Sequence, residues 1–119
     1  MSLIFYNKTG TPIAYSDNKV NVFYFTGKAI AYIHQDSIYS YEGKHLGFFK
    51  DGWIRDNQGK CVLFTLNAKN GPKKRIKDIS PVKSQKSDIP DMKSRENIKI
   101  RLIEKQEWSE LISKEFFKQ

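Results

Sequence analysis

Residues 27–32 read Gly27-Lys28-Ala29-Ile30-Ala31-Tyr32, and a similar order of residue types follows three other glycines of the chain. An internal sequence repeat of fixed period determines the whole architecture of a chain. Each unit is too short to hold both a strand and a helix, and its apolar positions alternate, which is typical of a β-hairpin. The four glycines, spaced by 17, 16 and 16 residues, are Gly10, Gly27, Gly43 and Gly59.

Aligning the units on these glycines brings four further columns into register. The columns hold Phe5, Val22, Ile38 and Ile54 five residues before the glycine; Ile13, Ile30, Leu46 and Val62 three residues after it; Ala14, Ala31, Gly47 and Leu63 four after it; and Tyr15, Tyr32, Phe48 and Phe64 five after it. Strict alternation places the aliphatic and aromatic columns of the returning strand on one face. We interpret that face as the core. The small column then lies opposite, where another backbone can approach.

The turns also follow from residue type. Thr26-Gly27 and Glu42-Gly43 predict tight two-residue turns, in which glycine adopts the required positive φ at little cost. Residues 7–10 and 56–59 predict type I turns that begin with Asn or Asp and end in a left-handed glycine. A single hairpin cannot bury its own face. The four hairpins of residues 3–66 are therefore predicted to close into a small pseudo-four-fold barrel without free edges.

The second half of the chain breaks this pattern. Residues 67–97 predict a basic, extended strap or loop around Gly71-Pro72 and Pro81. In residues 98–119, Ile98, Ile100 and Leu102 alternate with cations, which predicts one further strand. The spacing of Trp108, Leu111, Ile112 and Phe116 then predicts a short helix packed on the hairpins, with Ser109 as its N-cap. The expected whole is one mainly β domain over residues 1–119.

The glycine units and the second half together carry a family resemblance. The run over residues 43–56 (Gly-Lys-His-Leu-Gly-Phe-Phe-Lys-Asp-Gly-Trp-Ile-Arg-Asp) resembles repeats three and four of bacterial four-fold beta-flower domains, and Gly10–Tyr15 and Gly27–Tyr32 resemble the earlier repeats. Pro81-Val82-Lys83 and the closing Trp108–Leu111 segment with Phe116-Phe117 are similar too, although that family has denser Pro-Val-Lys repeats. The resemblance implies the fold and no particular activity.

Composition and the absence of known motifs narrow the range of possible functions. Residues 1–66 hold seven Lys/Arg against five Asp/Glu, and residues 67–119 hold fourteen against eight, so most of the net charge of +8 lies in the second half. There is one cysteine, no basic-then-apolar leader and no apolar run near the roughly 18 residues of a membrane span. We expect a cytoplasmic protein with no membrane partner. Motifs for nucleotide, metal, cofactor or hydrolase sites are missing, so no cofactor, no metal and no enzyme activity are expected.

Three groups of residues are candidate sites. The run of cations in residues 73–77 suits a polyanion. The rings that alternate on the strands entering repeats two and three would suit single-stranded nucleic acid if they were exposed, although we expect the second half to cover them. The candidate polyanion-binding residues are Lys73, Lys74, Arg75 and Lys77, and the candidate aromatic surface is Phe23, Phe25, Tyr39 and Tyr41.

The third group is a candidate pocket. His45 and Cys61 hold equivalent positions in repeats three and four, two residues after the turn glycine. Adjacent imidazole and thiol groups form a nucleophile in some enzymes. The alternative is that His45 makes a structural hydrogen bond and Cys61 is a small buried apolar residue. Asp51, Asp56 and Asn57 lack the spacing of a calcium loop and are explained by turns.

These observations favour a non-catalytic interaction or structural module, which binds a protein partner or associates with itself. Nucleic-acid or polyanion binding through the basic second half is the alternative. A carbohydrate or choline binder built from short aromatic hairpins ranks last, because Trp53 is the only tryptophan of the repeats.

Overall fold

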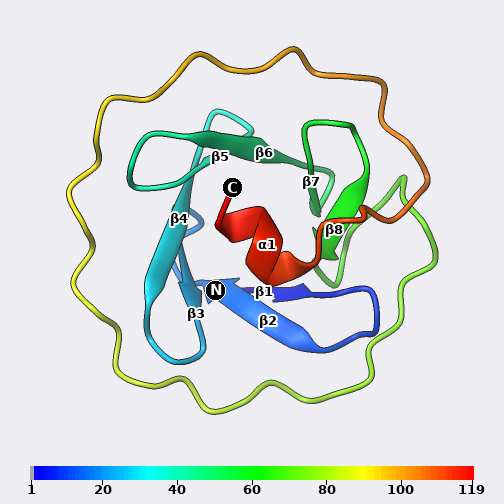
Figure 1. Ribbon diagram of the computed structural model, residues 1–119. Coiled ribbons are helices and arrows are strands. Elements are labelled where there is room, and N and C mark those ends of the chain that lie inside the picture. The colour runs from blue at the N-terminus through cyan, green and yellow to red at the C-terminus, as the bar shows by residue number, and fades with distance from the viewer. Residues whose placement is uncertain (1) are drawn as a thin grey trace.

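The computed structural model describes residues 2–119, in which eight strands form one closed antiparallel barrel in chain order (Figure 1). Each repeat supplies one hairpin, so the predicted mainly β, four-hairpin barrel is confirmed. The strands are β1 (Leu3–Tyr6), β2 (Pro12–Ser16), β3 (Asn21–Tyr24), β4 (Ala29–His34), β5 (Ser37–Tyr39), β6 (His45–Lys50), β7 (Trp53–Arg55) and β8 (Cys61–Phe64).

All four hairpins use the same turn. The N–H of each turn glycine donates to the carbonyl three residues earlier, at 2.9–3.1 Å, and each glycine has a φ between 85° and 95°. At Asn7 and Asp56 the side-chain oxygen also accepts two backbone N–H groups of its turn, as predicted for those loops. The predicted two-residue turns at Gly27 and Gly43 are wrong, because the loops there are one residue longer and match the other two.

A bulge in the returning strand of every hairpin reverses the predicted facing of the aromatic column. The register skips one residue in each hairpin, at Ile13, Ile30, Leu46 and Val62. A bulged residue and its successor lie on the same side of the strand. The aliphatic and small columns therefore both line the barrel together with the Phe5 column, whereas the aromatic column points outward.

The barrel interior is completed by the chain's last element, α1 (Ser113–Phe117), which Figure 1 shows at the centre of the ring of strands. The Phe116 side chain is fully buried in the same cluster as Phe5, Val22 and Ile38. A Cβ at Gly47 would lie 2.1 Å from the backbone carbonyl oxygen of Arg55 and 2.9 Å from the Phe116 ring, so this position of the small column makes room both for a backbone, as predicted, and for a ring.

The strap runs over residues 67–112 and encircles all four hairpins as an outer ring (Figure 1). It is longer than the predicted 67–97 and contains no helix or strand among its described residues. Its length explains its conformation. The protein is 35 Å across, so a path around it is about 110 Å long, which roughly 33 fully extended residues cover. The 46 residues of the strap, as a helix rising about 1.5 Å per residue, would be only about 69 Å long and could not complete the path.

The strap meets the hairpins at a regular interval. A strap N–H donates to the carbonyl of each turn glycine, at 2.7–3.1 Å, and at Gly10 the N–H of Asp78 adds a second, longer bond of 3.3 Å. The donors of the four shorter bonds are Lys77, Ser87, Glu96 and Lys105, which are ten, nine and nine residues apart. The strap therefore has its own four-fold register, matched to the repeat of the barrel.

Replacing Gly27 with alanine is expected to release this part of the strap and destabilise the fold. The φ of +95° costs an alanine about 1–2 kcal/mol. The new Cβ would also lie 1.9 Å from the carbonyl oxygen of Gln85, so the strap backbone must move away. Urea denaturation measures the loss of stability, and limited proteolysis measures cleavage around residues 84–87.

Asp36→Ala provides the matched control. Asp36 has a φ of +64° in an exposed joint turn between hairpins and makes no side-chain hydrogen bond within residues 2–119. Its replacement therefore measures the effect of a substitution at a position of positive φ, with no change at a strap contact. Equal proteolysis of the strap in the two variants would contradict the proposed contact.

Two sequence predictions for the C-terminal part are wrong. Residues 98–102 are extended but form no strand within the described chain, because no neighbouring strand pairs with them. The helix starts at Ser113 and does not follow Ser109. The Ser109 hydroxyl instead donates to the Asp56 carboxylate and accepts the N–H of Leu111, which holds this residue in the approach to α1.

Candidate functional site

The four candidate aromatic residues are buried. Phe23, Phe25, Tyr39 and Tyr41 are each less than a tenth exposed and lie between the barrel and the strap. Tyr15 stacks on Phe23 at 5.8 Å where hairpins one and two meet, and Tyr32 stacks on Tyr39 at 5.7 Å where hairpins two and three meet. The rings therefore fill the seams between hairpins and offer no open platform to a nucleic acid.

The strap covers these seams with its cations. Lys83 Nζ lies 4.4 Å from the centre of the Tyr15 ring, Arg95 Cζ lies 5.7 Å from that of Tyr39, and Arg101 Cζ lies 4.5 Å from that of Phe48. A cation over a ring face is attracted by about 0.5–2 kcal/mol, depending on its hydration. Three cations of the basic second half, other than the predicted polyanion-binding residues, therefore lie over rings of the barrel.

The aliphatic side chains of the strap point the opposite way. Ile79 and Val82 are 93% and 91% exposed, and Ile100 and Ile103 are 84% and 86% exposed. The first pair lies between the strap's contacts with hairpins one and two, and the second between its contacts with hairpins three and four. We call these four residues the aliphatic belt. The three cations therefore lie over rings of the barrel, whereas the aliphatic belt faces solvent.

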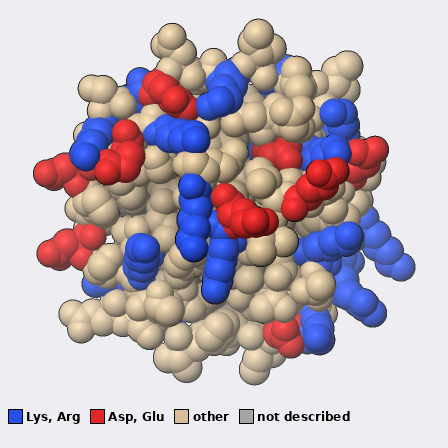
Figure 2. Space-filling model, viewed as in Figure 1, with Lys and Arg blue, Asp and Glu red and all other residues tan. Residues whose placement is uncertain are grey.

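The predicted polyanion site is divided by the fold. Lys74 Nζ donates to the carbonyls of Leu66 and Ala68, at 3.0 and 2.7 Å, and so stabilises the chain where it leaves the barrel. Lys73, Arg75 and Lys77 are exposed and form no ion pair within residues 2–119. Figure 2 shows cationic and anionic side chains interspersed over the face that carries α1, without a single-sign field.

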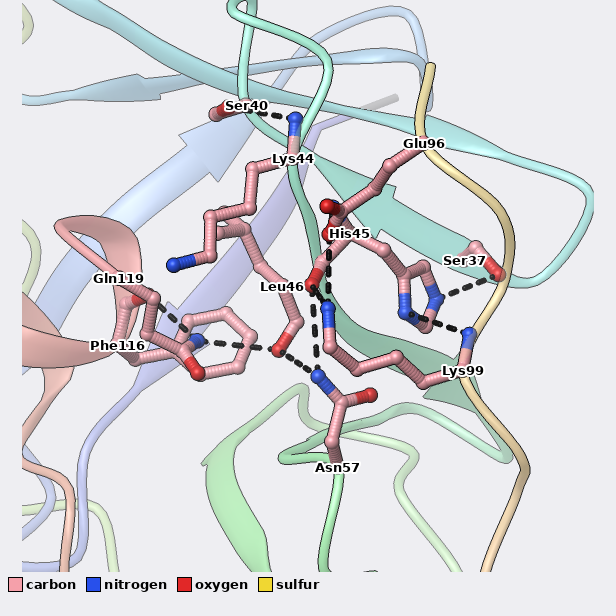
Figure 3. A network of polar contacts seen from close by, with 10 residues as sticks. All are labelled: Ser37, Ser40, Lys44, His45, Leu46, Asn57, Glu96, Lys99, Phe116 and Gln119. Atoms are coloured by element: carbon pink, nitrogen blue, oxygen red, sulfur yellow. Dashed lines mark hydrogen bonds and ion pairs between the residues drawn. The ribbon is translucent and has the colours of Figure 1, made fainter.

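His45 is fully buried beneath the strap in a polar network (Figure 3). Its Nε2–H donates to Ser37 Oγ at 3.1 Å, and the backbone N–H of Lys99 approaches its Nδ1 at 3.4 Å. The Glu96 carboxylate accepts the His45 backbone N–H at 2.6 Å. Both imidazole nitrogens are therefore used in joining β6 to β5 and to the strap.

The candidate pair of His45 and Cys61 does not form an enzyme-like nucleophile. Burial lowers the pKa of His45, which keeps the imidazole neutral, and burial raises the pKa of Cys61 to about 11, which keeps the thiol protonated. The Cys61 thiol faces the carbonyl of Lys105, and its backbone forms a bridge with Trp108. Each residue is thus in contact with a separate part of the strap.

The buried imidazole predicts a dependence of stability on pH. Below about pH 6.5 the unfolded chain takes up a proton at His45. The folded protein, with its lowered pKa, does not. Stability is therefore expected to fall as pH decreases from about 6.5 toward the folded-state pKa. Urea denaturation at pH 7.5 and 5.5 should show a smaller difference for His45→Gln than for the wild type, and an equal difference would contradict the assignment.

Four cavities stand out among those that border residues 2–119. The widest, about 590 Å³, is an open cleft between hairpins two and three beside α1, lined by Tyr24, Tyr41 and Phe117. The strap residue Lys93 also lines this cleft, and its Nζ lies 2.7 Å from Oε2 of Glu42 in an ion pair. Cys61 lines a cavity of about 210 Å³, and His45 lines none of the four. The cavity beside Cys61 therefore does not bring the two candidate residues together.

Arg55 joins the two ends of the strap. Its buried guanidinium donates to the carbonyls of Asn70 at 2.6 Å and Lys105 at 2.7 Å, and to that of Gly59 at 2.8 Å. Gln106 Nε2 donates to the same Asn70 carbonyl at 3.0 Å. Sequence analysis missed this role. The signal was present, because Arg55 interrupts a column, four residues before the turn glycine, that is otherwise aromatic.

The aliphatic belt was also missed as a site. Its member Ile79 recurs at intervals of ten and nine residues as Ile89 and Ile98, which are about half exposed and lie outside the belt; this period matches the strap's register on the hairpins. That period could have indicated a segment that wraps the four-fold core. The exposure of the aliphatic residues could not have been read from it.

Two further properties of residues 2–119 bear on function: the grouping of metal-ligating side chains and the length and hydropathy of helices. No group of three or more His, Cys, Asp or Glu side chains in this range is arranged to hold a metal ion. Within the same range, the chain has no helix with the length and hydropathy that crossing a membrane requires.

Comparison with known proteins agrees with the architecture. No curated protein and no solved structure matches the chain. The family described as 4-fold beta flower protein matches residues 4–117, from the first strand to the end of α1. With four hairpins closed around one axis and a match over nearly its whole length, the chain belongs to the 4-fold beta flower protein family.

Proposed function

We propose that this protein is a non-catalytic interaction module that binds a protein partner through the aliphatic belt of its strap. The observation that carries the proposal is the exposure of Ile79, Val82, Ile100 and Ile103, each at least 84%. Isolated exposed aliphatic residues are common on monomeric proteins. Here they stand in two pairs on one covering segment, and cations occupy the inner positions that aliphatic residues usually take.

The free energy gained by burying these side chains supports a binding role. Burial of one Ile or Val side chain contributes about 1.5–3 kcal/mol, so four contribute roughly 6–12 kcal/mol. Association costs about 4–15 kcal/mol in lost freedom of motion. Because the two pairs lie in different sectors of the strap, each contributes about 3–6 kcal/mol at its own contact, which helps to offset that cost when further contacts are added.

The rest of the molecule offers less to a catalytic function. Phe116 fills the barrel interior, His45 uses both ring nitrogens in structural hydrogen bonds, and the pKa of Cys61 favours the thiol. Nucleophilic or acid–base catalysis needs a group that is accessible and partly ionised. Neither residue combines these properties, which favours an interaction role for the protein.

Site-specific photo-crosslinking tests the proposal. A benzophenone side chain is placed at Ile79, at Ile100 and, as the control, at the exposed turn residue Lys8. Irradiation of cells that produce the protein should give an adduct of defined mass from a belt position and none from position 8. The partner, once identified by mass spectrometry, must bind the purified protein. Equal adducts from all three positions, or none from the belt, would contradict the proposal.

Polyanion binding remains the second candidate, because Lys73, Arg75 and Lys77 are exposed without an ion pair in the described range. Three contacts to phosphates of duplex DNA would change the slope of log K against log salt by about 2.7. Substitution of all three by serine should reduce the slope measured with a labelled duplex by that amount. Serine at Lys8, Lys28 and Lys114 is the control, and an unchanged slope in the first variant would exclude this site.

A further inference from the structure

Residues 97–104 of the strap have the character of a strand without a partner. The segment lies between two hydrogen bonds to the hairpins, from Glu96 N to Gly43 O at 2.8 Å and from Lys105 N to Gly59 O at 3.0 Å. Between them, the long contact of Lys99 N with His45 Nδ1 is the one hydrogen bond that the backbone N–H groups make within residues 2–119. The Ile103 carbonyl lies against Gly59, whereas the other N–H and C=O groups make no hydrogen bond within residues 2–119 and can pair with another chain.

The side chains of residues 98–102 alternate as they do in a strand, and the alternation ends at Ile103, which is 86% exposed. Lys99 Nζ reaches the carbonyl of His45 at 3.1 Å, and Arg101 lies over the ring of Phe48, so both cations face the barrel. Ile98 and Leu102 are 51% and 41% exposed, and Ile100 between them is 84% exposed. The outward face is therefore aliphatic, on a segment rich in the β-branched residues that favour strands.

We propose that residues 97–104 capture an extended, acidic segment of a partner protein as an added β-strand. The inference rests on the proposed interaction function and specifies its mode. Main-chain hydrogen bonds to a free edge supply affinity, and the side chains that alternate along the edge supply specificity. The pattern that fits this edge is an alternation of carboxylates with aliphatic residues.

Charge favours an acidic partner over a second copy of the chain. The strap contains twelve Lys/Arg against seven Asp/Glu. Lys99 Nζ is already paired with the Glu96 carboxylate at 2.7 Å, whereas Arg101 makes no ion pair within residues 2–119 and is left for a carboxylate of a partner. Pairing of two copies of residues 97–104 would bring Lys99 and Arg101 close to the same residues of the other copy. Like charges on paired strands are destabilising, whereas carboxylates there would form cross-strand ion pairs.

Fluorescence anisotropy with a labelled eight-residue peptide of alternating Glu and Val tests the capture, using the full chain. The wild type should bind this peptide and should not bind the alternating Lys–Val peptide. Ile100→Ser should weaken binding at least tenfold. Ile79→Ser removes an equally exposed aliphatic residue from another sector of the strap, and should change affinity less than twofold.

Amide hydrogen exchange distinguishes strand pairing from other contacts. Addition of the Glu–Val peptide should slow exchange at residues 98–103 and leave the exposed N–H groups near Ile79 unchanged. Equal binding of the two peptides, equal weakening by the two serine variants, or binding without protection of residues 98–103 would each overturn the proposal.

Sedimentation of the wild type and of Ile100→Ser tests the alternative that the edge pairs with a second copy of the chain. If the protein is a dimer that Ile100→Ser converts to a monomer, the edge pairs with a second copy and the acidic partner is wrong. If photo-crosslinking at Ile100 yields a protein partner while the Glu–Val peptide does not bind, the interaction function stands and strand capture fails.

Discussion

Replacing Phe116 with alanine is expected to lower the free energy of unfolding by about 3–5 kcal/mol, as is typical of large-to-small changes at buried aromatic residues. Phe116 is the side chain with which α1 fills the barrel, and it is fully buried. Gly47 has no side chain to occupy the vacated space. The neighbouring strands belong to a closed sheet and cannot easily collapse into the cavity, which places the expected loss in the upper part of the range.

Urea denaturation followed by circular dichroism measures this effect. Ile112→Ala is the matched control, because Ile112 immediately precedes the same helix but is mostly exposed. That variant should change the free energy of unfolding by less than about 0.5 kcal/mol. A loss below 1 kcal/mol for Phe116→Ala would mean that α1 does not complete the core in solution.

Replacing Arg55 with methionine is expected to lower the free energy of unfolding by about 3 kcal/mol and to open the strap. Methionine keeps a long apolar stem but donates no hydrogen bond. The carbonyls of Asn70, Lys105 and Gly59 would then lose their charged donor, and each buried acceptor left unsatisfied costs about 1–3 kcal/mol. Gln106 still donates to Asn70, which keeps the expected loss below the sum of three such costs.

Limited proteolysis and thermal denaturation separate the two consequences. The strap of Arg55→Met should be cleaved near residues 70 and 105 before the hairpins are attacked, because the ends of the strap are the parts released. Arg75→Met is the control, since Arg75 is an exposed strap residue with no ion pair in the described range. Uniform cleavage of hairpins and strap in Arg55→Met would contradict a local role in closing the ring.

The hairpin repeat was predictable because its signals are local. The positive φ of Gly10, Gly27, Gly43 and Gly59 depends on a few neighbouring residues and is reflected in the sequence. The direction of the aromatic column was not predictable from alternation, because one bulged residue per hairpin changes the face of every residue after it. The bulges at Ile13 and Ile30 have no residue type that would have revealed them.

The candidate site was predictable in a more limited way. Residues 98–102 have a strand's sequence and an extended conformation, but a strand also requires a paired neighbour, which no local pattern specifies. The basic charge of the strap was visible, whereas its inward use by Lys83 and Arg101 depends on rings that lie far away in the sequence. Likewise, the interrupted column at Arg55 was visible, but its acceptors at Asn70 and Lys105 became neighbours only when the ring closed.

The sequence by itself therefore determined the four hairpins, their glycine turns and their closure, since short-range backbone preferences and an internal period are sufficient for these. Tertiary structure alone decided that Lys83, Arg95 and Arg101 of the strap lie over rings of the barrel and that the aliphatic belt faces solvent. The physical reason is that the outer seams already carry rings such as Tyr15 and Phe48, which attract cations. The opposite side of an extended chain must then point outward, so Ile79 and Ile100 remain exposed.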